Sequence, residues 1–348
     1  MTRPSLNAPL ARMAFALLIG AGGGCLAFVL GLPLPWMLGA LFTTMAAALA
    51  GLPVLPPNRI RPATVAVIGV LLGARFTPEI VSVIGGWTLS LGLLALYLVV
   101  VASVTVPLYR FAGKADWQTA YLSGLPGGLA EMVELGEERK ADVRTIILAH
   151  TLRIVLTIAL IALWFRVIKG EAVGSLPDFG GAPLTLFDAA VLLFCAVAGS
   201  YGGRLARLPA PTFLGPMILS AVLHATDVTA SAPPLPIVIA AQVILGTVLG
   251  CRFLGTQKAT LLPALGLSLV ATLATLAIAL AFALLIRQTS GLPVDQIILA
   301  LAPGGLTEMG LIALAINADV AFVALHHVVR ILIVLVLARP ILGLLPKD

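Results

Sequence analysis

Apolar residues fill twelve long runs along this chain, and short polar stretches separate the runs. The runs cover residues 11–30, 35–55, 62–75, 86–111, 117–136, 143–168, 184–203, 211–226, 236–253, 259–286, 295–316 and 320–345. A helix needs roughly 20 apolar residues to cross the hydrocarbon core of a bilayer, and most of the runs approach that length. The pattern therefore predicts an all-α protein that passes through a membrane many times.

The order of these runs repeats itself along the chain. Residues 26–39 align with residues 202–215, and both segments contain Leu-Pro followed by Leu-Gly. The segments 72–76 and 249–253 both read Leu-Gly, one further residue, then Arg-Phe. The sequence therefore predicts two repeats, residues 1–169 and 170–348, with a Gly-rich linker near residues 169–183.

Most of the polar chemistry lies in two matching stretches, residues 126–153 and 303–330. Each reads Pro-Gly-Gly-Leu, one residue, Glu-Met, then Ala-Asp-Val, and finally a His three residues before an Arg. The offset between the copies stays at 177 (330 − 153), which indicates that the spacing from the glycines to the arginine matters. The shared residues are Pro126, Gly127, Gly128, Glu131, Asp142, His150 and Arg153 in the first copy and Pro303, Gly304, Gly305, Glu308, Asp319, His327 and Arg330 in the second.

The distribution of positive charge predicts that the two halves are inverted. Arg59 and Arg61 follow the second run of the first half, whereas Arg204 and Arg207 follow the first run of the second half. Lysine and arginine gather on the cytoplasmic side, so equivalent loops with opposite charge bias indicate opposite orientations. Inversion requires an odd number of crossings, which favours about five crossing helices per half and a Pro-Gly-Gly hairpin that enters and leaves on one side. The alternative, in which run 295–316 crosses outright, stays open.

The Pro-Gly-Gly segments predict two broken helices. Proline lacks an amide donor and glycine admits backbone angles that other residues avoid, so a helix breaks there. The freed backbone groups are tolerated at membrane depth only where protein or a water-filled cavity surrounds them. Two such breaks at corresponding positions of inverted halves are typical of a transport site near the midplane. A packing kink or a surface turn is the alternative interpretation.

Arg153 and Arg330 are the sharpest candidates for binding. If their helices begin ten residues earlier, both lie about 15 Å deep, roughly half of a 30 Å hydrocarbon core. A charged side chain at that depth costs about 2.5–3.5 kcal/mol or more, so each guanidinium must face the bundle and have a partner. The partner is either a carboxylate of the same motif or an anionic group of a substrate held in a bidentate fork. The two interpretations are compatible.

The remaining motif residues are candidates for tuning the charge of the site. His150 and His327 lie one helical turn before the arginines on the same face, as buried neutral groups or as proton relays. The glutamates follow the hairpin proline by five residues and are predicted to carry a coupling proton, to help hold Na⁺, or to pair with an arginine. We expect coupling or charge tuning from Glu131, Glu308, Asp142, Asp319, His150 and His327.

The amino-acid composition narrows the class of protein further. Hydrophobic residues make up 60% of the chain and the mean hydropathy is +1.11, far above the roughly 45–50% apolar content of soluble domains. The net charge of +6 is therefore a topology signal, and no nucleic-acid partner is expected. The three cysteines lie in apolar runs without paired spacing, and the adjacent His326 and His327 point about 100° apart on a helix. We expect no metal and no cofactor beyond a coupling Na⁺ or proton.

The duplicated motif, with the Leu-Gly-x-Arg-Phe segment before it, resembles the AbrB family of bacterial membrane proteins over both halves. Members are labelled regulators of gene expression or ammonia monooxygenases, and neither label explains these residues. No stretch reads as a soluble DNA-binding segment, and copper chemistry needs clustered imidazoles, whereas the chain has four histidines. The architecture is also similar to secondary transporters with inverted halves and re-entrant hairpins, an analogy of fold that says little about substrate.

The sequence thus predicts a multi-pass inner-membrane protein that is not an enzyme. The expected function is secondary transport of a small anionic metabolite at the interface of the two repeats, with the two arginines and the Pro-Gly-Gly residues at the binding site. A membrane sensor or regulator of gene expression is the first alternative, and a membrane monooxygenase is the second. The expected partners are a small-molecule substrate and the lipid bilayer, and self-association is left open.

Overall fold

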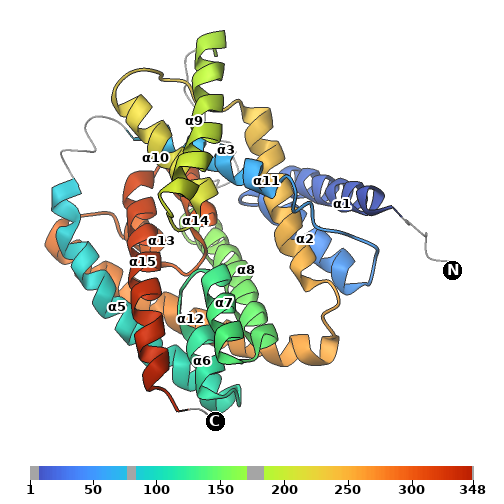
Figure 1. Ribbon diagram of the computed structural model, residues 1–348, viewed down its shortest axis with the longest axis vertical. Coiled ribbons are helices and arrows are strands. Elements are labelled where there is room, and N and C mark those ends of the chain that lie inside the picture. Colours follow the sequence, from blue (N-terminus) through green and yellow to red (C-terminus); the bar gives the residue numbers. More distant parts are fainter. Residues whose placement is uncertain (1–7, 77–83, 171–183, 347–348) are drawn as a thin grey trace. The chain divides into compact units, whose positions relative to one another are not determined.

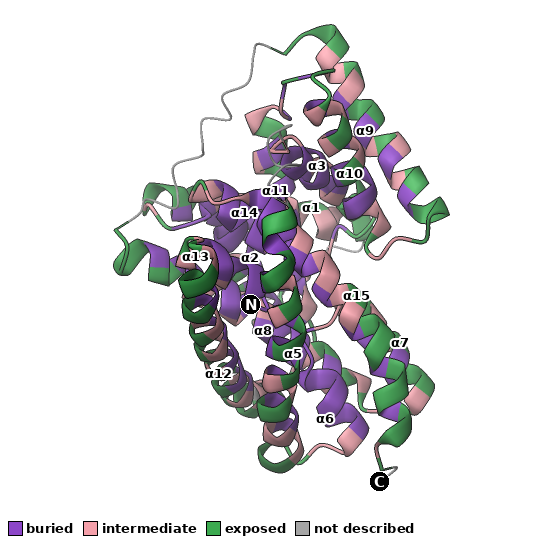
Figure 2. Cartoon of the chain, turned by 90° about the vertical axis from the view of Figure 1, so that its left-hand side faces the viewer, coloured by how far each residue is buried: buried purple, intermediate pink, exposed green. Residues whose placement is uncertain are grey.

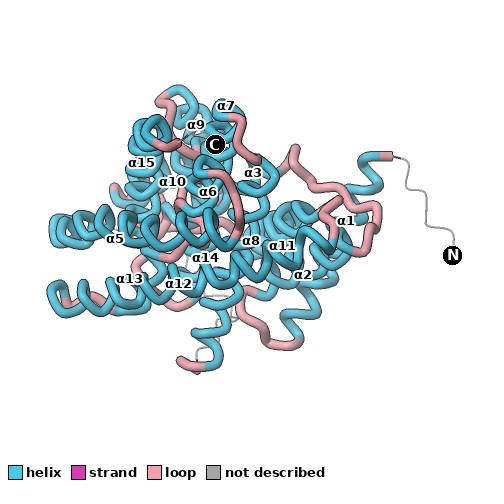
Figure 3. Tube along the Cα trace, turned by 90° about the horizontal axis from the view of Figure 1, so that it is seen from below, coloured by secondary structure: helices cyan, strands magenta, loops and turns pink. Residues whose placement is uncertain are grey.

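The computed structural model describes residues 8–76, 84–170 and 184–346, and helices dominate this part of the chain. Within it no strand occurs (Figure 3). Seven helical segments of these described ranges are long and apolar enough to cross a membrane: 9–29, 85–112, 143–167, 186–205, 235–253, 259–290 and 320–344. The predicted count of about ten crossings is reached only if three shorter apolar helices, Pro35–Leu49, Arg61–Gly73 and Pro211–Ala225, also cross.

The described chain forms two compact units, and each unit takes helices from both halves of the sequence. The first unit contains α1 (Pro9–Val29), α2 (Pro35–Leu49), α3 (Arg61–Gly73), α9 (Leu186–Leu205), α10 (Pro211–Ala225) and α11 (Leu235–Gly250) with its 3-10 extension η3 (Cys251–Phe253). The second contains η1 (Ile84–Trp87), α5 (Thr88–Pro107), η2 (Leu108–Ala112), α6 (Trp117–Gly124), α7 (Leu129–Arg139), most of α8 (Val143–Val167), α12 (Lys258–Ser290, apart from its first residue), α13 (Val294–Leu301), most of α14 (Leu306–Ala315) and α15 (Val320–Leu344) (Figure 1). Compact units and sequence repeats are therefore different divisions of the chain.

Glycines hold the helices of the first unit together. A Cβ on Gly39 of α2 would overlap the backbone of Gly23 in α1, and a Cβ on Gly215 of α10 would overlap the backbone of Gly199 in α9. Both pairs stand at equivalent positions of the two sequence halves, 176 residues apart (199 − 23 and 215 − 39). Small residues allow membrane helices to approach closely, where packing rather than the hydrophobic effect stabilises association.

Close packing at glycines also joins helices of the two sequence halves within this unit. Gly69 of α3 lies against the backbone of Phe213 in α10, and Gly246 of α11 lies against the backbone of Met37 in α2. Each third helix therefore packs on the second helix of the other half. Equivalent helices make equivalent crossings, as expected if the two halves descend from a duplication.

The second unit combines long helices with two short, interrupted elements. The long helices α5, α8, α12 and α15 have strongly apolar sequences, and α5 packs against both α6 and α15. The interrupted elements are α6 with α7 and α13 with α14, none of them longer than 11 residues. Every residue of α6 from Gln118 to Gly124 is buried (Figure 2). The polar motif lies on these interrupted elements and on α8 and α15.

Candidate functional site

Each Pro-Gly-Gly segment interrupts a helix. In the first copy α6 ends at Gly124, the backbone of Leu125 is extended, and α7 begins at Leu129. In the second copy α13 ends at Leu301, and α14 begins at Leu306 after Gly305, which has a φ of +89° that favours glycine. The last carbonyls of α6 and α13 receive no hydrogen bond from an amide of their own helix, so they need donors from elsewhere.

Arg153 and His150 of α8 supply those donors in the first copy. The Arg153 Nη1 donates to the carbonyl of Leu125 at 2.8 Å and more weakly to that of Ser123 at 3.5 Å. The Arg153 Nη2 lies 2.9 Å from the Nδ1 of His150, and the His150 Nε2 lies 2.8 Å from the carbonyl of Leu122. The two side chains therefore hold the end of α6 from one face of α8.

Arg330 and His327 of α15 repeat this arrangement in the second copy. The Arg330 Nη1 donates to the carbonyl of Ala302 at 2.8 Å and to that of Leu301 at 3.3 Å. The Arg330 Nη2 lies 2.8 Å from the His327 Nδ1, and the His327 Nε2 lies 2.9 Å from the carbonyl of Leu299. The repeated sequence motif thus corresponds to a repeated set of hydrogen bonds, which we call the arginine clamp of each copy.

The hydrogen bonds assign the protonation of both histidines. A carbonyl oxygen only accepts, so the imidazole Nε2 carries the proton, and a guanidinium only donates, so the Nδ1 is an unprotonated acceptor. Both imidazoles are therefore neutral in this arrangement, and each orients one guanidinium. A proton-relay role for His150 and His327 stays a prediction.

The two clamps share neighbours inside the second unit. A Cβ on Gly304 would lie 3.0 Å from the Cγ2 of Thr157 on α8, and a Cβ on Gly127 would lie 2.9 Å from the Cγ1 of Val334 on α15. The helix that carries the clamp of one copy therefore contacts the break of the other copy. The Tyr97 hydroxyl of α5 donates to the Leu301 carbonyl at 2.9 Å, which Arg330 also approaches.

The aspartates of the motif begin the clamp helices. The Asp142 carboxylate accepts bonds from the Thr145 hydroxyl at 2.6 Å and from the Arg144 amide at 3.0 Å at the start of α8. Asp319 is the N-cap of α15 and accepts from the Phe322 amide at 3.0 Å. These are the N-cap bonds that aspartate favours. A role of Asp142 and Asp319 in charge tuning stays a prediction.

The glutamates of the motif lie in the first turns of α7 and α14. The Glu131 carboxylate folds back over Gly128, where an added Cβ would overlap it, and the Glu308 carboxylate does the same over Gly305. The Thr307 hydroxyl donates to the Glu308 carboxylate at 2.6 Å. Both negative charges therefore stand at helix N-termini, which stabilise anions.

The two clamp guanidiniums are deeply buried, with exposed fractions of 6% for Arg153 and 4% for Arg330. Among the residues that the structure describes, no carboxylate forms an ion pair with either of them. Backbone carbonyls and imidazoles take the place of the internal carboxylate that one interpretation of the sequence expected. In both residues the Nε–H has no hydrogen-bond partner within the described chain.

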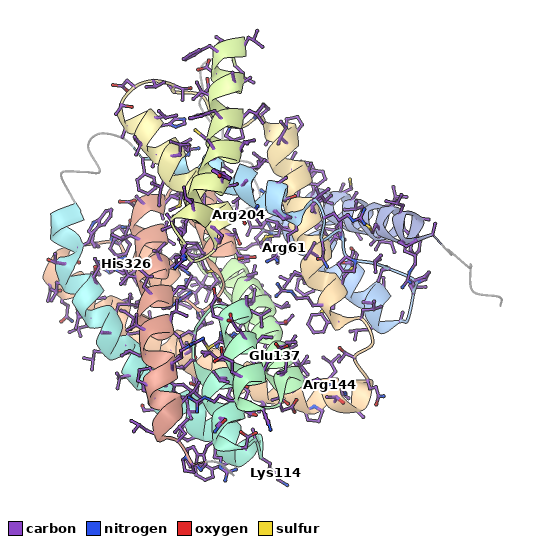
Figure 4. All side chains as sticks on the ribbon, in the orientation of Figure 1. Arg61, Lys114, Glu137, Arg144, Arg204 and His326 are labelled. Atoms are coloured by element: carbon purple, nitrogen blue, oxygen red, sulfur yellow. The ribbon has the colours of Figure 1, made fainter. Side chains whose placement is uncertain are left out.

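His326 takes no part in either clamp. Its Nδ1 lies 2.8 Å from the Phe322 carbonyl and its Nε2 lies 2.9 Å from the Ser90 hydroxyl of α5. Figure 4 labels His326 on α15, in contact with the neighbouring helix α5. In the described ranges no group of three or more His, Cys, Asp or Glu side chains is arranged to hold a metal ion.

Sequence reasoning missed Tyr97, Ser123 and Thr157. The Ser123 and Thr157 hydroxyls are buried without a hydrogen-bond partner in the described residues. Thr157 follows Arg153 by one turn on the same face, so helical spacing from the arginine was a signal that could have found it. Tyr97 lies in an apolar run, and nothing in the local sequence singles it out.

A helical fold with seven segments fit to cross a bilayer and buried charges on paired helices defines a multi-pass membrane protein. The sequence matches the family described as "Transition state regulatory protein AbrB" over residues 36–345, and the chain belongs to this AbrB family. It is 24% identical over 353 residues to "Uncharacterized protein YhjN" of Bacillus subtilis (strain 168), covering 94% of this chain and 91% of that protein. It is 27% identical over 310 residues to "Putative regulator AbrB" of Escherichia coli (strain K12), covering 87% of this chain and 88% of that protein.

Proposed function

We propose that this protein is a secondary transporter of a small anionic metabolite in the inner cell membrane, and that the two arginine clamps form its binding site. The observation that carries the proposal is the pair of buried guanidiniums, each without a carboxylate partner and each with an Nε–H that has no partner among the described residues. Carbonyls and neutral imidazoles orient a guanidinium, but they leave its positive charge uncompensated.

The energetic argument is that two uncompensated charges in one buried region are costly. Removing an ion from water costs several kcal/mol after relaxation, and hydrogen bonds to neutral groups offset only part of it. An anion bound between the clamps would supply the missing negative charge and accept the two Nε–H donors. Guanidinium groups suit this task because they bind carboxylates through two parallel hydrogen bonds.

The interrupted helices support transport in particular. The α6–α7 and α13–α14 elements are each too short on either side of the break to cross a bilayer, since an 11-residue helix spans only about 16 Å. We propose that both are re-entrant hairpins belonging to inverted repeats, which is how many secondary transporters build a midplane site. The N-termini of α7 and α14 favour negative charge, and the glutamates there are the proposed groups for coupling to a proton or Na⁺.

The test is flux into liposomes that contain the purified protein, with a panel of radiolabelled carboxylates under imposed proton and Na⁺ gradients. We expect saturable uptake that follows one gradient and falls to background in Arg153→Lys and Arg330→Lys. Arg339→Lys is the matched control, because Arg339 lies on α15 in an exposed ion pair with Glu138 at 2.9 Å. Normal uptake by both clamp variants in folded protein would overturn the assignment of the site.

A regulatory function is the second candidate, and the printed name of the Escherichia coli relative favours it. The same buried anion site would serve a sensor that binds a ligand without moving it. Saturable binding to the purified protein, combined with no flux under any gradient, would favour the sensor.

A further inference from the structure

The two arginine clamps are equivalent in their main hydrogen bonds, and they differ in the weaker second bond of Nη1, which goes to the Ser123 carbonyl in the first copy and to the Leu301 carbonyl in the second. In each, Nη1 is held by a carbonyl at the break, Nη2 is held by a histidine Nδ1, and Nε–H has no partner. The donors left for a ligand are therefore Nε–H and the second N–H of Nη2 on both arginines, and they come from different helices, α8 and α15. A ligand that uses both clamps needs two acceptor groups.

The positive charge of the site also favours a ligand with two negatively charged groups. The site has two fixed positive charges, and no carboxylate of the described chain pairs with either. A monoanion would compensate one guanidinium and leave the other unbalanced at a buried position. A dianion compensates both.

The hydroxyl of Thr157 makes the two halves of the site chemically different. Thr157 is fully buried and contacts Gly304, and its counterpart 177 residues later is Val334, which contacts Gly127. Valine and threonine have nearly the same shape, so at this position the two halves differ by one hydroxyl group. Thr44 and Thr105 donate to the carbonyl four residues earlier at 2.6–2.8 Å. The Thr157 hydroxyl, like those of Thr151, Thr247 and Thr272, has no partner in the described chain.

We infer that the substrate is a short dicarboxylate, bound with one carboxylate on the Nε–H edge of each clamp arginine, and that Thr157 selects a hydroxyl or keto substituent on its carbon chain. The inference rests on the proposed anion site and names the class of ligand that the site takes. A compact tetrahedral dianion such as phosphate or sulfate offers the same charge, so the experiment includes it. Because a dicarboxylate separates its two acceptor groups, it suits donors that lie on two helices better than a single tetrahedral group does.

The experiment is binding to purified protein by isothermal titration calorimetry, followed by competition in the liposome assay. The ligands are propionate, malonate, succinate, glutarate, hydroxysuccinate, phosphate and sulfate. We expect one of the dicarboxylates to bind at least about tenfold more tightly than propionate, phosphate or sulfate. Arg153→Gln and Arg330→Gln should each weaken dicarboxylate binding by about ten- to hundredfold while leaving propionate binding within about threefold. Arg339→Gln is the control that keeps full dicarboxylate binding.

The exchange of threonine and valine at positions 157 and 334 tests whether Thr157 selects a substituent on the ligand. Thr157→Val should weaken hydroxysuccinate by about five- to tenfold and leave succinate unchanged, because only the ligand with a hydroxyl loses a hydrogen bond. Val334→Thr serves as the matched variant and should not weaken succinate. Tighter binding of propionate, phosphate or sulfate than of every dicarboxylate would overturn the inference while the anion site stands. If the folded protein bound none of these anions, both the dicarboxylate inference and the proposed anion site would be overturned.

Discussion

Replacing His327 by alanine tests whether the histidines hold the clamp guanidiniums in place. His327 is fully buried, its Nε2 donates to the Leu299 carbonyl at 2.9 Å, and its Nδ1 accepts from the Arg330 Nη2 at 2.8 Å. Alanine removes both bonds and leaves a carbonyl and a guanidinium N–H without these partners. At this buried position, water could take over these hydrogen bonds only if the surrounding helices separated.

The expected loss in the free energy of unfolding follows from these two hydrogen bonds. A neutral hydrogen bond contributes about 0.5–1.5 kcal/mol and one to a charged group about 1.5–3 kcal/mol. The free energy of unfolding should therefore fall by about 2–4.5 kcal/mol in His327→Ala, with a further loss from the cavity. His327→Gln should recover part of the loss, because its amide can donate at one end and accept at the other.

The assay is reversible unfolding of the purified protein in mixed micelles titrated with sodium dodecyl sulfate, followed by far-ultraviolet circular dichroism. Arg339→Ala is the control, since an exposed ion pair contributes at most about 1 kcal/mol. His150→Ala should behave as His327→Ala does, because its bonds of 2.8 and 2.9 Å are equivalent. A loss in both histidine variants no larger than in Arg339→Ala would refute the clamp as a stabilising unit.

Three further changes test the helix caps and the glycine contacts. Asp319→Ala removes the N-cap bond to the Phe322 amide and should lower the free energy of unfolding by about 1 kcal/mol in the same assay, whereas Asp319→Asn should be near neutral. Gly215→Leu should separate α10 from α9 and lower the unfolding midpoint strongly, while a leucine at Gly202, where an added Cβ meets nothing, should not. Burial would raise the pKa of Asp142, but bonds from the Thr145 hydroxyl and amide and from the Arg144 amide outweigh it and hold the pKa below its ordinary value. A carboxyl with a lowered folded pKa stabilises above its unfolded pKa of about 3.9 and loses this contribution as pH falls through the folded value, so Asp142→Asn should show a smaller acid loss of stability, measured as unfolding midpoint against pH.

The sequence was most informative where the chemistry is local. Proline and glycine disfavour the interior of a helix, and α6 and α13 end just before these segments. The histidine and the arginine of each copy were predicted to lie one turn apart on the same helix face, and their nitrogen atoms lie 2.9 Å apart in the first copy and 2.8 Å apart in the second. Local spacing was sufficient for both predictions because neither depends on how the helices pack.

Packing determined what local patterns could not. The sequence indicated that each arginine needs a partner, but a carboxylate and a backbone carbonyl are equal candidates until the chain is folded. Tyr97 contacts a carbonyl 204 residues away, and no periodic pattern predicts a contact of that kind. The grouping of helices from both halves into each compact unit is likewise a property of packing, and the division into repeats near residue 169 stays a prediction.

The fixed spacing of the motif follows from the geometry of the first clamp. Asp142 begins α8 beside α6, where its amide donates to the Thr119 hydroxyl at 2.8 Å. His150 and Arg153 follow on α8 eight and eleven residues after Asp142, about 12 and 16 Å along the helix. Helical side chains lean toward the N-terminus, so both reach back to the carbonyls at the end of α6. One residue added between Asp142 and Arg153 would rotate the arginine by about 100° away from the break. A clamp of this kind therefore requires the constant offset that the two copies share.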